Sequence, residues 1–195
     1  MTEDNSLAQR PGSGVRRVPG EASDATPSSS RQEIGSWAAF AQAWPARAAT
    51  GAQLLTRYGI AYLGTIRKNG SPRICPITPI LADGRVYAAI AAATPKCADL
   101  RRDGRYALHA LPGQEREEEL CLGGVAHELI DGWTSERAQA LVEGHGVIWS
   151  AGDALFELQI QRVLWAEYDR DGSGALLTRR DSWSSEVLLP ESQRR

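Results

Sequence analysis

The fold is decided by residues 60–92, which read IAYLGTIRKNGSPRICPITPILADGRVYAAIAA. Two short polar segments, Lys68-Asn69-Gly70-Ser71 and Asp83-Gly84, separate three runs rich in β-branched and aromatic residues. Asn-Gly between such runs is a strong hairpin signal, because a type I′ turn needs two residues that tolerate positive φ. The sequence therefore predicts an antiparallel meander of three strands, over residues 60–67, 71–81 and 85–92.

A short helix is predicted directly after the third strand. Thr94 is a good N-cap, Pro95 fits the first helical position, and Gly104 ends the helix. Lys96 then lies in the first turn, where backbone N–H groups and the helix dipole favour an anion. A cation there opposes the dipole, which makes sense if a phosphate lies between them. The alternative is that Lys96 is a solvated charge on a connecting helix.

Three prolines interrupt the second strand, namely Pro72, Pro76 and Pro79. Each removes a donor from the ladder, which is incompatible with a regular central strand. One interpretation is an edge strand protected against aggregation. The other is that the sheet parts here and leaves backbone groups free to meet a ligand. Between the prolines, alternation places Arg73, Cys75 and Ile77 on one face.

The rest of the chain continues the alternation of strands and short helices. We expect helices over 34–44, 48–57 and 134–143, and strands over 105–111, 120–130 and from Phe156 onward, with a last strand ending near Trp183. The acidic run 114–119 is expected to be a solvated loop. Tight turns cannot join parallel strands, so a Rossmann-type sheet is rejected. A mainly β protein with peripheral α, closed as an antiparallel barrel, hides the sheet edges.

Composition and charge limit the classes of function. The 195 residues are 42% hydrophobic, which fits one domain over 32–185 between a disordered tail, 1–31, and a C-terminal tail, 186–195. The net charge of −2 gives no excess of positive charge that would indicate binding to nucleic acid or to an anionic membrane. We expect no membrane span and no secretory signal, and we expect a cytoplasmic location. The three cysteines and three histidines lack metal-ligand spacing, so no metal is expected.

Four runs stand in an order that resembles a known family: 62–77, 84–87, Thr94-Pro95-Lys96 and 99–109. From about Trp37 to Trp183 the chain is similar to the pyridoxamine 5′-phosphate oxidase-like, FMN-binding split-barrel family. The resemblance implies a six- to seven-stranded antiparallel split β-barrel. It also implies a homodimer that holds FMN, or alternatively a deazaflavin, at the subunit interface.

The resemblance further implies which residues contact the cofactor. The phosphate would bind at Thr94, the local backbone N–H groups and Lys96, and the isoalloxazine would lie against the strand through residues 73–77. The implied contacts are Arg73, Cys75, Pro76, Ile77, Ile90, Thr94, Lys96 and Glu119. Cys75 stands where relatives often have Arg, His or Ser. No catalytic residue is assigned.

Two classes of function follow from this resemblance. The first is a flavin-dependent oxidoreductase acting on a small molecule, in which the cofactor carries the hydride and electron chemistry. The second is a non-enzymatic flavin- or tetrapyrrole-binding protein on the same scaffold. The fold alone does not separate them.

Overall fold

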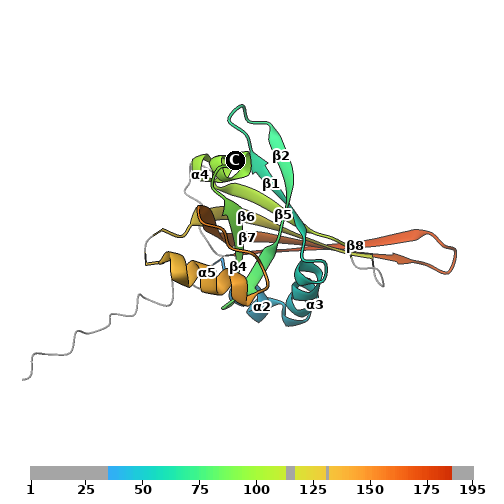
Figure 1. Ribbon diagram of the computed structural model, residues 1–195. Coiled ribbons are helices and arrows are strands. Elements are labelled where there is room, and N and C mark those ends of the chain that lie inside the picture. Colours follow the sequence, from blue (N-terminus) through green and yellow to red (C-terminus); the bar gives the residue numbers. More distant parts are fainter. Residues whose placement is uncertain (1–34, 113–116, 131, 186–195) are drawn as a thin grey trace, which may run out of the picture.

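The computed structural model describes residues 35–112, 117–130 and 132–185 (Figure 1). The two predicted tails, 1–31 and 186–195, lie outside the described residues. The described helices and strands are α2 (Trp37–Ala43), α3 (Pro45–Thr56), β1 (Ala61–Ile66), β2 (Pro72–Ile77), β3 (Pro79–Ala82), β4 (Arg85–Ala91), α4 (Pro95–Arg102), β5 (Arg105–Ala110), β6 (Glu117–Glu128), α5 (Ser135–Gly144), β7 (Asp153–Arg170) and β8 (Leu176–Ser184). Because β6 begins at Glu117, the end of the acidic run is strand rather than the loop that its charge suggested.

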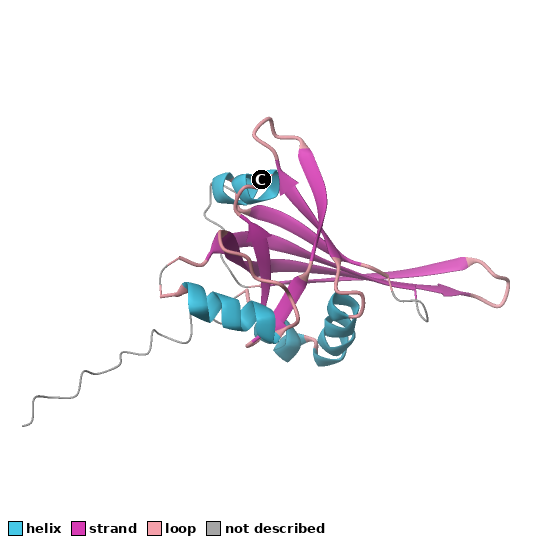
Figure 2. Ribbon diagram, viewed as in Figure 1, coloured by secondary structure: helices cyan, strands magenta, loops and turns pink. Residues whose placement is uncertain are grey.

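The strands form one antiparallel sheet in the order β2-β1-β5-β6-β7-β4-β3, with β8 paired to β7 (Figure 2). The predicted mainly β split barrel is confirmed. The strand count of six to seven was wrong, because the segment 71–81 forms two strands separated by Thr78. β2 pairs with β1 at one end of the strand order and β3 pairs with β4 at the other. The sheet therefore parts at the prolines, as one interpretation of the sequence expected.

The two hairpin turns differ from each other. Asp83 (φ 49°) and Gly84 (φ 69°) both have positive φ, as a type I′ turn requires. At Asn69-Gly70 only the glycine does, so the hairpin is confirmed but the expected type I′ turn there was wrong. The Asn69 side chain explains the difference, because its Oδ1 accepts hydrogen bonds from the Ser71 amide (3.1 Å) and hydroxyl (2.7 Å) and holds a wider loop.

A row of apolar side chains inside the barrel fixes the register of the central strands. Leu63 of β1 pairs with Leu108 of β5, Leu108 with Leu122 of β6, and Leu122 with Val163 of β7. All four are fully buried. Burial of such a side chain contributes about 1.5–3 kcal/mol. Helices α2 and α3 cover this core with buried residues that include Trp37, Phe40, Leu54 and Leu55.

Alternation places the neighbouring residues on the opposite side of the same strands, which we call the outer face. Its central row, by strand pairing, is Pro76, Tyr62, His109, Cys121, Leu164 and Ser182. Ile74 and Gly64 form part of the next row. Large apolar side chains are exposed here, at 73% for Ile74, 47% for Tyr62 and 41% for Leu164. The outer face is therefore more apolar than a solvated sheet surface needs to be.

Two features shape the far end of the sheet. The register between β6 and β7 shifts at Gly123/Gly124, where the strands cross so closely that a Cβ on Gly124 would lie 1.9 Å from the Gln159 carbonyl oxygen. Beyond this point β7 and β8 continue as a long ribbon that projects from the body of the molecule, and β6 stays paired with β7 as far as Tyr168 (Figure 1). The Trp183 ring packs against Phe40 with centroids 5.6 Å apart and anchors the ribbon's base.

None of the described helices has the length and apolar character needed to cross a membrane.

Candidate functional site

The start of α4 has the geometry that the sequence predicted. Thr94 is the N-cap, Pro95 occupies the first turn, and the Thr94 hydroxyl accepts from the Cys97 amide at 3.4 Å. The same hydroxyl donates to the Ala91 carbonyl at 2.7 Å. Its single hydrogen is therefore engaged, and Thr94 acts here as a cap that orients the helix start.

Lys96 connects the first turn of α4 to the interrupted strand. Its ammonium donates to the Pro76 carbonyl oxygen at 3.1 Å, and the side chain is half-buried. Lys96 is therefore not a purely solvated charge, which was the alternative interpretation of the sequence. An ammonium has three donors, so two remain after this hydrogen bond.

The carboxylate of Asp99, only 4% exposed, lies behind Lys96 on the same helix. It accepts from Arg73 Nε at 2.6 Å, Thr65 Oγ1 at 3.0 Å and Arg102 Nη1 at 3.2 Å. Burial alone would raise the pKa of Asp99, but the hydrogen bonds from Arg73, Thr65 and Arg102 outweigh it and hold the pKa below its usual range. The carboxylate thus fastens α4 to β1 and β2.

We call the set Arg73, Cys75, Thr94, Lys96 and Asp99 the α4 corner. Together with Arg102 it holds three cations against one carboxylate, a net charge of +2. Burial raises the pKa of the Cys75 thiol, although Lys96 and Arg73 pull it down. The thiol is therefore neutral, and the excess positive charge is available to an anion.

The structure brings most of the predicted site residues together. Arg73, Cys75, Thr94 and Lys96 share the α4 corner, and Pro76 joins them through its carbonyl. Ile77 and Ile90 are buried in the core, at 6% and 1% exposure. Glu119 lies on β6 on the outer face, in the same row as Ala166. Glu119 thus lies on the other face of the sheet from the corner, and the flavin contacts of all three residues stay predictions.

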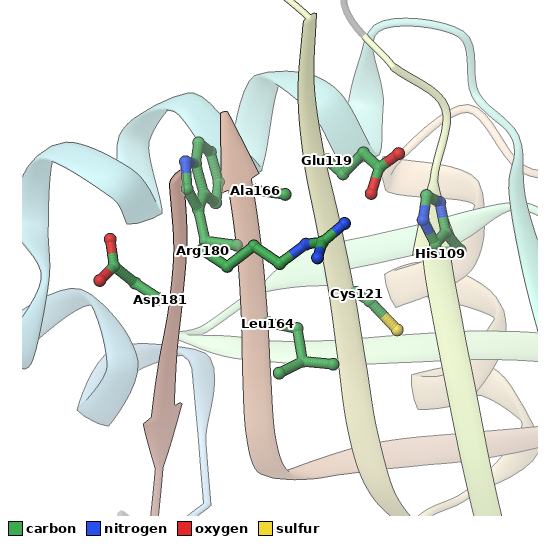
Figure 3. A pocket seen from close by; sticks show the side chains of 8 residues that line it. His109, Glu119, Cys121, Leu164, Ala166, Arg180 and Asp181 are labelled. Carbon is green, nitrogen blue, oxygen red and sulfur yellow. The ribbon is translucent and has the colours of Figure 1, made fainter. Parts of the chain in front are cut away.

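A second group of polar side chains surrounds a pocket of about 280 Å³ on the outer face (Figure 3). It is lined by His109, Glu119, Cys121, Leu164, Trp165, Ala166, Arg180 and Asp181. Strand pairing explains the hollow, because Glu119 pairs with Ala166 and Ala166 with Arg180. A small side chain thus lies between two long ones. In Figure 3, Arg180 extends from β8 across Ala166 toward β6. We call this cavity the outer pocket.

The charged groups of the outer pocket differ in their pairing. Asp181 is paired with Arg47 at 2.5 Å. Arg180 and Glu119 form no hydrogen bond or ion pair with any residue that the structure describes. His109 Nδ1 lies 2.7 Å from the Ala110 carbonyl, which can only accept, so Nδ1 carries the hydrogen and Nε2 remains open. Burial, with Glu119 nearby, raises the pKa of the Cys121 thiol.

Sequence reasoning missed Asp99, His109 and Arg180 as site residues. For Asp99 a signal existed, because it lies three residues after Lys96 and three before Arg102, on one side of a helix. For His109 and Arg180 the alternation of a strand indicates a face but not the neighbouring strand. Their proximity to Glu119 depends on pairings between β5, β6, β7 and β8 that are distant in sequence.

No family model matches the sequence, and no curated protein matches it. Among solved structures, a NimC/NimA family protein from Clostridium acetobutylicum is 14% identical, with a TM-score of 0.50 over 69% of this chain and 90% of that chain. The chain has the split-barrel fold of the pyridoxamine 5′-phosphate oxidase-like proteins.

Two further split-barrel structures are similar to this chain at lower TM-scores. A pyridoxamine 5′-phosphate oxidase-related, FMN binding protein from Nostoc punctiforme is 12% identical over 69% of this chain and 95% of that chain, with a TM-score of 0.48. A heme binding protein from Mycobacterium smegmatis is 21% identical over 68% of this chain, with a TM-score of 0.48, and the chain spans 56% of its length. Neither likeness assigns a ligand or a function to this chain.

Proposed function

We propose that this split-barrel chain is a flavin-binding protein that holds FMN by its phosphate at the α4 corner and acts as an oxidoreductase on a small molecule. The observation that carries the proposal is that Lys96, in the first turn of α4, and Arg73 both lie near Cys75, so that the α4 corner has a net charge of +1. This positive charge and the positive end of the helix dipole both favour the binding of a phosphate.

The donors left open in the α4 corner fit a phosphate. Lys96 uses one of its three donors on the Pro76 carbonyl. Arg73 uses Nε on Asp99, and a guanidinium has five donors in all. Asp99 meanwhile fixes the direction of the Arg73 side chain. These groups would hold the phosphate of FMN, or equally the phosphate of a deazaflavin.

The bound flavin supplies hydride and electron transfer, so the chain itself needs only to bind and orient. The neutral Cys75 thiol offers no nucleophile beside the phosphate, since the reactive form of cysteine is the thiolate. The interrupted β2 gives the flavin ring a neighbouring strand with a free edge. We assign no catalytic residue.

We also propose that two chains assemble through the part of the outer face formed by β1 and β2. Ile74 and Tyr62 are exposed there, and Gly64 lies between them without a side chain. A two-fold dimer buries one such patch against its own copy and so removes both from water. Sedimentation velocity at micromolar concentration is expected to show a dimer, and Ile74→Glu is expected to shift it to monomer. A monomeric wild-type chain would exclude a cofactor site shared between subunits.

Lys96→Ala tests the position of the phosphate. Loss of a charge-assisted hydrogen bond of about 1.5–3 kcal/mol should weaken FMN binding about 10- to 150-fold. Riboflavin has no phosphate, so its affinity should stay within about twofold. Flavin fluorescence quenching on titration measures both constants.

Lys68→Ala is the matched control, because Lys68 is an exposed lysine at the β1–β2 turn. It should change neither affinity appreciably. Equal losses of FMN and riboflavin binding in Lys96→Ala would contradict a phosphate at the α4 corner. A tetrapyrrole whose binding is indifferent to Lys96, in a protein that binds no flavin, would favour the non-enzymatic alternative.

A further inference from the structure

The outer pocket separates hydrogen-bond donors from acceptors on opposite walls. Arg180 of β8 supplies a guanidinium from one side, whereas Glu119 of β6 and His109 of β5 supply a carboxylate and an imidazole nitrogen from the other (Figure 3). We propose that this pocket binds a small α-amino acid with an apolar side chain, its carboxylate on Arg180 and its ammonium on Glu119 and His109.

Arg180 is the anchor for the carboxylate. Its guanidinium has no partner among the described residues, and Asp181, the nearest carboxylate on its own strand, is already paired with Arg47. A guanidinium binds a carboxylate through two parallel hydrogen bonds, which fixes orientation as well as charge. Arg179 and Arg180 alternate along β8, so only Arg180 shares the face of Ala166 and Glu119.

The opposite wall accepts hydrogen bonds. Because His109 Nδ1 donates to the Ala110 carbonyl, Nε2 is the hydrogen-bond acceptor of the neutral tautomer. The Glu119 carboxylate is half-buried and without a hydrogen-bond partner among the described residues. A primary ammonium has three donors and can serve both groups. A plain carboxylic acid would leave this wall unpaired, and a plain amine would leave Arg180 unpaired.

The floor between the two walls is apolar. Leu164 is 41% exposed although it lies on a strand that is paired on both sides. The side chain of Ala166, two residues further along the same strand, is small and leaves the space that forms the hollow. A volume of about 280 Å³ lies near the lower end of ligand pockets, which favours a single amino acid over a peptide or a nucleotide.

This inference does not depend on flavin binding. The pocket lies on the outer face over β5 to β8, whereas Arg73 and its partner Asp99 lie on the other side of the sheet, against α4. It also includes neither Ile74 nor Tyr62 of the proposed dimer patch. Lys96→Ala, which should weaken FMN binding, should therefore leave amino-acid binding unchanged.

The test uses three probes of one shape, measured by isothermal titration calorimetry on the full chain without flavin. L-Phenylalanine carries both charged groups, 3-phenylpropionate lacks the ammonium, and 2-phenylethylamine lacks the carboxylate. L-Phenylalanine should bind most tightly. Arg180→Met should weaken phenylalanine and phenylpropionate about tenfold or more and leave phenylethylamine within about twofold. Glu119→Gln should weaken phenylalanine and phenylethylamine and spare phenylpropionate.

The neighbouring residues on the opposite face provide matched controls. Arg179→Met and Glu118→Gln remove the same charges one position away, and neither should alter the binding of any probe. The proposal is overturned if the wild-type chain binds none of the three probes at millimolar concentration. It is equally overturned if Arg180→Met weakens the acid and the amine alike, or if the control variants lose as much affinity as Arg180→Met and Glu119→Gln.

Discussion

The α4 corner and the outer pocket hold the same kinds of side chain in opposite states. In the corner, Asp99 is 4% exposed and accepts hydrogen bonds from three side chains. In the pocket, Arg180 and Glu119 face the same hollow and form no hydrogen bond or ion pair within the described part of the chain. Charges that are buried and paired hold elements together, whereas charges that are open and unpaired are available to a ligand.

The two regions also differ in how much an unpaired carboxylate would destabilise the fold. An unpaired buried carboxylate would cost several kcal/mol, so Asp99 requires all of its partners. Glu119 keeps contact with water and tolerates being unpaired. Substitution of Asp99 should therefore affect folding first, whereas substitution of Arg180 or Glu119 should affect binding.

The largest effect is expected for Asp99→Asn. The amide cannot accept from Arg73, Thr65 and Arg102 as the carboxylate does, so the free energy of unfolding should fall by about 2–3 kcal/mol. Urea denaturation followed by tryptophan fluorescence measures the change. Glu128→Gln, which loses the more exposed pair with Arg101, should cost clearly less.

The pH dependence of that difference gives its physical cause. The pKa of Asp99 is depressed in the folded chain, so its contribution to stability is complete above the unfolded pKa of about 3.9 and is lost as the pH falls through the folded value. The gap between wild type and Asp99→Asn should therefore be full at pH 7 and narrow below about pH 4. A gap that persists unchanged into acid would mean that packing rather than charge holds α4.

The smallest effect is expected in the pocket. Arg180→Met and Glu119→Gln should each change the free energy of unfolding by no more than about 0.5 kcal/mol, because neither side chain has a partner to lose among the described residues. The same denaturation experiment measures this. A loss as large as that of Asp99→Asn would remove the distinction between the two regions and make the pocket a structural element.

Local signals explain which parts of this fold the sequence could predict. Thr94, Pro95 and Gly104 are adjacent to the helix they delimit, so α4 was predicted almost to the residue. The turn between β3 and β4 is likewise determined by two adjacent residues, Asp83 and Gly84. At Asn69 the side chain accepts the hydrogen bonds of the Ser71 amide and hydroxyl. The preference of an Asn-Gly pair for a type I′ turn does not take such side-chain hydrogen bonds into account.

Pairings between distant strands explain what the sequence could not predict. Whether residues 71–81 form one strand or two depends on β1 and β4, whose pairing places β2 and β3 at opposite ends of the strand order. The α4 corner was predicted in part because Thr94 and Lys96 share one turn. The outer pocket was not, because His109, Glu119 and Arg180 come from three strands whose register is set only when the whole sheet forms.

The β7–β8 ribbon has a consequence for local unfolding. Trp183 ties its base to Phe40, while residues 176–182 of β8 are exposed and pair only with β7. Beyond Tyr168, where β6 no longer pairs with β7, the ribbon has only two strands. Because an isolated two-stranded ribbon is marginally stable in water, the amides of this tip should exchange with solvent much faster than those of β5 or β6. Arg180 lies between the anchored base and the exposed tip. A ligand that holds Arg180 to β6 would therefore slow amide exchange along β8, even at residues that never touch the ligand.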